Sequence, residues 1–150
     1  MRAVTAPTWA GVEKGTALPA QSFTFRRADL VRYAGASGDF NVIHWNDRIA
    51  VEVGLPSVVA HGMLTMGTVA RVVTDWVGDP AAITEYGVRF TRPVPVPDDS
   101  ALDGSGGGSA IEVSAEVTEK SEDNRVKVTL KATYEGATVL AKAIAIVRLP

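Results

Sequence analysis

The sequence predicts an α+β fold in which a curved antiparallel sheet of about five or six strands wraps one long helix. Two patterns indicate this class. Apolar residues recur at steps of three and four between His61 and Val77, and after Pro80 they alternate at every second position in several segments. The chain has 150 residues, of which 46% are apolar and 21% charged, so one domain spanning residues 1–150 is expected.

The first third of the chain predicts short elements. Residues 1–18 show no strong period and are expected to form an extended arm. Ser22–Phe25 is short, aromatic and alternating, which is typical of a strand. Arg27–Ala34 predicts a helix, and the small residues Gly35–Gly38 are expected to end it. Asp47–Gly54 predicts a second short helix, with Asp47 as its N-cap and Gly54 as its terminator.

The long helix is predicted from His61 to Val77, and Gly78–Asp79–Pro80 is expected to stop it. Its predicted buried stripe is Met63, Met66, Val69, Ala70, Val73, Trp76 and Val77. Such a long apolar stripe suits a helix that is largely covered by sheet.

The remaining sequence predicts strands. The expected strands are Ile83–Phe90, Ile111–Val117, Val126–Tyr134 and Val139–Val147. Turn residues at 122–124 and 135–136 separate the last three, which favours an antiparallel meander. The glycine-rich run 104–109 lacks a following lysine or helix, so it predicts an inter-strand loop rather than a phosphate-binding loop.

Composition excludes several functions. A formal charge of −2 with no basic stripe argues against nucleic acid as a partner. The absence of cysteine excludes disulfides and thiolate metal sites, and it fits a reducing cytoplasm. No apolar run approaches the ~20 residues that a spanning helix needs, so no membrane association is expected.

Three chemically active side chains fall within six residues: Asp39, Asn41 and His44. A carboxylate and an imidazole on one loop can act as general acid and base, and an amide can orient a water molecule between them. The structural alternative is that Asp39 is a turn residue and His44 a packed histidine. The spacing alone does not decide between these interpretations.

The second signal is His61-Gly62-Met63 at the start of the long helix. The backbone N–H of Gly62, helped by the helix dipole, could hold a carbonyl oxygen. Tight packing is the structural alternative for this glycine. Together the two signals supply an acid, a base and an oxyanion donor, which is the minimum for chemistry beside a carbonyl.

Five further residues are tentative substrate-binding residues, and most have a simpler structural explanation. Ser37 can equally shape the turn before Asp39, and Arg89 and Arg92 can equally be surface arginines. His61 and Met63 belong to the second signal. A zinc site is not expected, because the two histidines lack paired-ligand spacing. A serine triad is not expected either, because no G-x-S-x-G motif occurs.

Three blocks of the sequence together resemble one family. The pattern from Tyr33 through Ser37-Gly38-Asp39-x-Asn41-x-Ile43-His44 to Asn46-Asp47 is similar to the hydratase-2 signature of MaoC-like dehydratases. Ala60–Leu64 resembles the family's second block, and Thr84–Asp98 resembles its third. Val42 departs from the pattern, because the family usually has proline there, which would stiffen the loop without adding chemistry.

The resemblance implies a single hotdog domain, in which a curved sheet wraps one helix, and a dimer with the active site at the interface. It implies interconversion of (3R)-3-hydroxyacyl and trans-2-enoyl thioesters, with Asp39 and His44 catalytic and with Asn41 and Gly62 in support. No cofactor is implied beyond the coenzyme A, or the phosphopantetheine of an acyl carrier protein, that carries the substrate.

Within the family, the motif arrangement looks most like the catalytic beta-type subunit of type II fatty-acid (3R)-hydroxyacyl-acyl-carrier-protein dehydratases. Those subunits pair with a non-catalytic homologue, so both a homodimer and a heterodimer fit. Two rival functions stay open. One is a hotdog acyl thioesterase, which attacks the carbonyl instead of C3. The other is a non-catalytic structural subunit or acyl-binding module.

Overall fold

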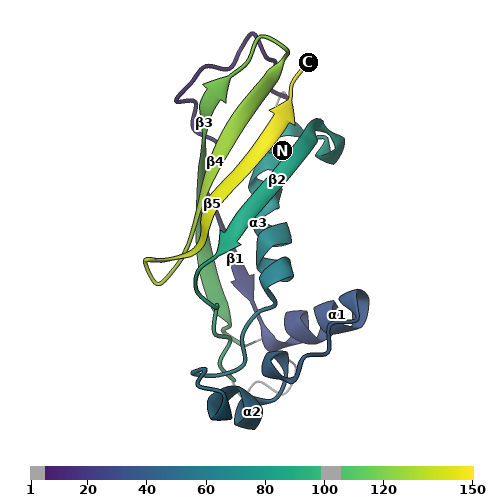
Figure 1. Ribbon diagram of the computed structural model, residues 1–150, viewed down its shortest axis with the longest axis vertical. Coiled ribbons are helices and arrows are strands. Elements are labelled where there is room, and N and C mark those ends of the chain that lie inside the picture. The colour runs from purple at the N-terminus through teal and green to yellow at the C-terminus, as the bar shows by residue number, and fades with distance from the viewer. Residues whose placement is uncertain (1–5, 99–105) are drawn as a thin grey trace.

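The computed structural model describes residues 6–98 and 106–150 and contains one curved antiparallel sheet (Figure 1). The order of its five strands is β1-β3-β4-β5-β2, so β1 and β2 form the two edges. The strands are β1 (Gln21–Phe25), β2 (Ile83–Phe90), β3 (Ser109–Lys120), β4 (Arg125–Tyr134) and β5 (Ala137–Arg148). The predicted α+β class and the central β3-β4-β5 meander are therefore confirmed.

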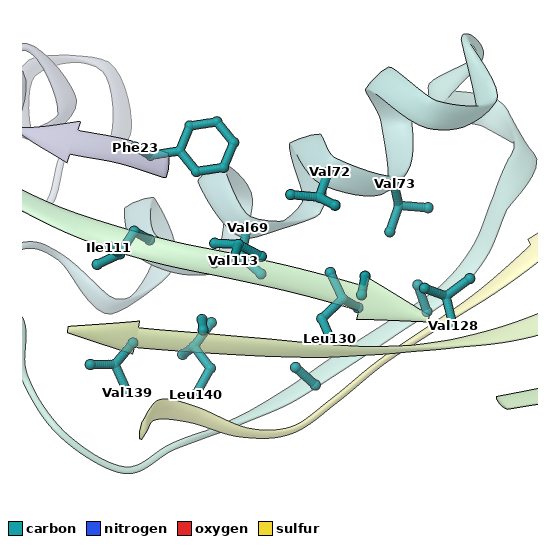
Figure 2. Close-up of a cluster of buried hydrophobic side chains, with 14 of the residues drawn as sticks. Phe23, Val69, Val72, Val73, Ile111, Val113, Val128, Leu130, Val139 and Leu140 are labelled. Atoms are coloured by element: carbon teal, nitrogen blue, oxygen red, sulfur yellow. The ribbon is translucent and has the colours of Figure 1, made fainter. Parts of the chain in front are cut away.

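The long helix α3 (Gly62–Val77) packs along the inner face of this sheet (Figure 1). Figure 2 shows Val69, Val72 and Val73 of α3 in the same apolar cluster as side chains from the strands, and all three are fully buried. The Tyr86 hydroxyl on β2 donates a hydrogen bond of 2.9 Å to the carbonyl of Met66. The helix is thus held by apolar packing along its length and pinned to an edge strand.

The buried stripe of α3 differs in part from the predicted one. Thr65 and Val72 are buried, whereas Met63 is 59% exposed. The predicted register assumed that the stripe begins at the first turn. That turn instead carries Gly62, which lies against the ring of Phe90 at the end of β2, and Met63 points to solvent.

Alternating burial holds on β3 and β4 but breaks on β5. Val139 and Leu140 are neighbours and both are buried. The pairing with β4 shifts here, because Ala132 pairs with Leu140 whereas Leu130 pairs with Ala143. Lys142 has a positive φ of 49°. This β-bulge turns Leu140 inward, a change that a strict two-residue period does not predict.

The first helix is longer than predicted. α1 spans Arg27–Ser37, so it continues through the first three of the small residues that were expected to end it and ends at the last of them, Gly38. Only Gly38 adopts the left-handed conformation, with φ 76°, and its N–H bonds back to the carbonyl of Ala34. Glycine and alanine fit inside a helix, so the helix ends only where the backbone reverses.

Two short elements follow α1. A 3₁₀ turn, η1 (Val42–His44), was not predicted. Helix α2 (Asp47–Glu52) was predicted, but its N-cap is Asn46, whose side chain accepts a hydrogen bond from the N–H of Ile49. The carboxylate of Asp47 is engaged elsewhere. A second 3₁₀ turn, η2 (Pro80–Ala82), leads from α3 into β2.

The described part of the N-terminal arm is hydrogen-bonded to the domain. The N–H groups of Gly15 and Leu18 donate to carbonyls of β3, and Trp9 N–H donates to the carbonyl of Pro150 at 2.8 Å. Residues 1–5 of the predicted arm and residues 104–105 of the predicted glycine-rich loop lie outside the described residues. Among the described helices, none has the length and apolarity needed to cross a membrane.

Candidate active site

Local hydrogen bonds shape the loop that carries Asp39. The Ser37 hydroxyl donates to the carbonyl of Tyr33 at 2.7 Å and accepts from the N–H of Asp39. The N–H of Asn41 donates to Asp39 Oδ1, and Asn41 Oδ1 accepts from Ile43 N–H, which starts η1. Ser37 and Asn41 therefore direct the chain so that Asp39 and His44 lie on the same side.

His44 is buried and has one defined tautomer. Its Nδ1 lies 2.7 Å from the carbonyl oxygen of Val59. A carbonyl oxygen only accepts hydrogen bonds, so Nδ1 carries the proton and donates. The other ring nitrogen, Nε2, lies 3.9 Å from Oδ2 of Asp39, whose side chain is half exposed. The two groups can therefore contact the same oxygen atom of a bound molecule.

A bidentate ion pair anchors the segment that holds His44. Both terminal nitrogens of Arg27 donate to the Asp47 carboxylate at 2.9 Å, and Asp47 also accepts from the N–H of Val58. The Arg27 guanidinium lowers the pKa of Asp47 below its ordinary value. The residue after Val58 is Val59, whose carbonyl holds His44. The ion pair between α1 and α2 thus helps to position the Val59 carbonyl that sets the tautomer of His44.

His61 lies behind this pair, with 1% of its surface exposed. Its Nε2–H donates to the backbone carbonyl of Asp39 at 3.1 Å. Its ring stacks on the ring of His44 with centroids 3.7 Å apart and 21° between the planes, and the ring of Tyr33 meets it edge-on. Burial lowers the pKa of His61.

A cavity of about 350 Å³ opens beside His44 and Gly62. Gly62 is the first residue of α3, and the N–H groups of a first helical turn have no acceptor within the helix. A Cβ at Gly62 would lie 3.1 Å from the ring of Phe90, so only glycine fits there without displacing that ring. The cavity is lined by Ile43, His44, Val59, Ala60, Gly62, Thr65, Phe90, Thr91, Arg92, Pro93, Val94 and Leu140.

The structure separates the tentative substrate-binding residues. Arg92 lines the cavity, whereas Arg89 and the exposed Met63 do not. His61 does not line the cavity, and its side chain contacts Asp39 and His44. Val59, Phe90 and Leu140 were not predicted as site residues. Val59 acts through its carbonyl, and Leu140 is turned inward by a bulge, so no side-chain pattern marks either of them.

A larger hollow of about 790 Å³ lies between β1, α1 and α3. It is lined in part by Arg26, Arg32 and Arg71. None of the predicted catalytic or binding residues lines it. The smaller cavity, which contains His44 and the start of α3, is therefore the candidate active site.

The side chains of Asp39, His44 and His61 offer metal-ligand atoms within 4.8 Å of one another. Carbonyl oxygens already engage His44 Nδ1 and His61 Nε2. The two remaining nitrogens lie in nearly parallel planes of stacked rings. An imidazole binds a metal along its own ring plane, so these lone pairs do not converge on one ion. The geometry favours acid–base use of the cluster, and the expected absence of a metal stays a prediction.

This constellation of a Nδ1-protonated histidine, a facing aspartate and a glycine at the start of a sheet-packed helix is found on a hotdog fold. The model of the family described as "MaoC like domain" matches residues 11–137. The chain therefore belongs to the MaoC-like domain family. The predicted hotdog fold is confirmed by the solved relatives described next.

Three relatives illustrate the similarity. The 3-hydroxyacyl-thioester dehydratase X of Mycobacterium tuberculosis is 37% identical over 92 residues, which are 59% of this chain and 32% of that protein. A solved MaoC-like dehydratase is 36% identical with a TM-score of 0.88, over 97% of this chain and 43% of the other. The R-hydratase PhaJ1 of Pseudomonas aeruginosa is 26% identical with a TM-score of 0.78, over 95% and 85%. The chain thus spans less than half the length of the first two.

Proposed function

We propose that this chain catalyses the reversible addition of water to trans-2-enoyl thioesters, giving (3R)-3-hydroxyacyl thioesters. One observation carries the proposal. The carbonyl of Val59 holds the proton of His44 on Nδ1, so Nε2 is left to face Asp39 beside the cavity where α3 begins. Relatives named as a dehydratase and an R-hydratase support a hydro-lyase of this type.

In the hydration direction, the thioester carbonyl accepts a hydrogen bond from Gly62 N–H, which stabilises enolate character as electrons leave the C2–C3 double bond. Nε2 of His44 takes a proton from water while the water oxygen bonds to C3. The imidazolium then returns that proton to C2. The Asp39 carboxylate holds the second hydrogen of the water molecule. One water is consumed, and both additions occur on the same face.

We assign the carrier to coenzyme A or the phosphopantetheine of an acyl carrier protein, with Arg92 at the cavity able to meet its phosphate. No cofactor takes part in the steps above.

We also propose that the protein acts as a homodimer, or as a heterodimer with a homologous hotdog subunit like the beta-type dehydratase subunits. One edge of strand β2 has no strand partner within the described sheet, so it is free to pair with a second subunit. The same strand carries the exposed Phe90 near the cavity.

The test is hydration of the crotonyl thioester of coenzyme A, and of the same acyl group on an acyl carrier protein, by the purified chain, followed as loss of enoyl-thioester absorbance. The same samples are assayed for free thiol. Loss of absorbance without thiol release supports a hydratase. Thiol release would indicate the rival thioesterase. Activity that arises only after a homologous subunit is added would support a heterodimer, and no activity with either carrier would refute the proposal.

A further inference from the structure

We propose that His61 is a positioning residue that keeps the acid–base pair aligned with the start of α3, and that it does this as a neutral imidazole whose Nε2–H holds the backbone of Asp39. The inference rests on the proposed function. It concerns a residue that does not line the cavity, so its role must be exerted through other groups.

The first argument is connectivity. His61 directly precedes Gly62, the proposed carbonyl-binding residue. Its side chain bonds to the backbone of Asp39 at 3.1 Å, and its ring lies 3.7 Å from the ring of His44. A single side chain therefore joins the loop that carries the acid–base pair to the helix that carries the oxyanion donor.

The second argument is protonation. The carbonyl of Asp39 only accepts, so the proton of His61 sits on Nε2. Its Nδ1 is buried and has no hydrogen-bond partner among the described residues. A second proton there would create an unpaired buried N–H on a cation. The ring is enclosed by Tyr33 of α1, His44 of η1 and the loop at Asp39.

The third argument concerns His44. In the proposed reaction His44 becomes an imidazolium between its two proton transfers. A neutral aromatic face stacked on a cation stabilises it, whereas a second imidazolium would repel it. A neutral His61 is therefore compatible with the cationic intermediate.

Two substitutions separate the hydrogen bond from the ring. His61→Gln retains a side-chain N–H of similar reach and loses the ring. His61→Phe retains a flat ring and loses the donor. We expect His61→Phe to lower kcat for crotonyl-coenzyme A hydration by about tenfold or more with KM changed less than about threefold, since misplaced catalytic groups affect turnover most. We expect His61→Gln to stay within about fivefold of wild type.

A thermal melting curve for each variant shows whether its fold is intact. Loss of activity by His61→Phe in an intact fold supports the positioning role of His61. His61→Phe with wild-type kcat, or a less active His61→Gln than His61→Phe, overturns the proposal. A second readout needs no activity. Nitrogen-15 NMR of the two ring systems should show His61 protonated on Nε2 only and not titrating near 6.5, the ordinary histidine value. Titration near that value would overturn the inference, even if the wild-type protein proved to lack hydratase activity.

Discussion

The imidazole rings of His44 and His61 stack with their centroids 3.7 Å apart, yet their protons point to different carbonyls. His44 donates through Nδ1 to Val59, and His61 donates through Nε2 to Asp39. The two histidines of the chain therefore have different parts in one cluster. One presents a free nitrogen to the carboxylate of Asp39, and the other supports the backbone behind it.

Removal of the acid–base pair should abolish most of the turnover. Asp39→Asn and His44→Ala are each expected to lower kcat for enoyl-thioester hydration by about 10²-fold or more, because proton transfer loses its positioned group. Asp75→Asn is the matched control, since Asp75 is an exposed carboxylate on α3 away from the cavity. Undiminished hydration by both site variants would refute the assignment.

The contact between Gly62 and Phe90 should make these positions interdependent. In Gly62→Ala the new Cβ would lie 3.1 Å from the Phe90 ring, so the ring or the helix start must shift. We expect about a tenfold loss of kcat. Phe90→Leu in the same chain removes the crowded ring atoms and should restore part of the activity, and steady-state kinetics of the double-mutant cycle measure this coupling. Strictly additive losses would mean that crowding is not the cause.

The Arg27–Asp47 pair should contribute a pH-dependent part of the stability. The pKa of Asp47 is lowered in the folded state, so its contribution is complete above the ordinary aspartate value of 3.8 and is lost as the pH falls through the lower folded value. Asp47→Asn should cost about 1 kcal/mol at pH 7 in urea unfolding, a modest figure because the pair is partly exposed.

Glu52→Gln is the control for this measurement. It removes the partner of Arg48 in an exposed pair on α2, and such pairs contribute less than about 0.5 kcal/mol. Equal losses from the two substitutions would show that the Arg27–Asp47 pair does not anchor the Val58–Val59 segment.

The proposed dimer should depend on the exposed apolar residues near β2. Met63 is 59% exposed and follows Gly62, which contacts Phe90 on this edge strand. Met63→Lys is expected to shift native mass towards the monomer, because a desolvated lysine disfavours an apolar interface. Val31→Lys alters a similarly exposed apolar residue on α1 and should leave the mass unchanged. An unchanged mass for Met63→Lys would place the interface elsewhere.

The periodic parts of the fold could be predicted from the sequence. The limits of β2 were predicted to the residue, and α3 was predicted to within one residue at its start. Two of the errors fall where the backbone conformation at a single residue decides the outcome. α1 continued to Gly38 because only that glycine adopts a left-handed conformation, and β5 departed from alternation because a bulge at Lys142 shifts the register.

The residue types of the candidate site could be predicted from the sequence, but the contacts between them could not. Asp39, His44 and Gly62 were identified from local motifs, and the structure brings them together at one end of α3. The sequence could not indicate that a carbonyl at Val59 sets the tautomer of His44, because any residue at position 59 has that group. The sequence also predicts His61 only as a tentative substrate-binding residue, since its contacts with Tyr33, Asp39 and His44 come from three separate parts of the chain.

The hydrogen bond from the N–H of Trp9 to the carbonyl of Pro150 brings the described N-terminal arm next to the segment that follows β5. A short linker between these points would close the polypeptide with little loss of conformational entropy. Residues 9–150 are therefore a suitable unit for circular permutation, with new ends at the turn after Tyr134. In such a permutant the loop of Asp39 and the start of α3 keep their order along the chain, so acid–base chemistry should survive the rearrangement.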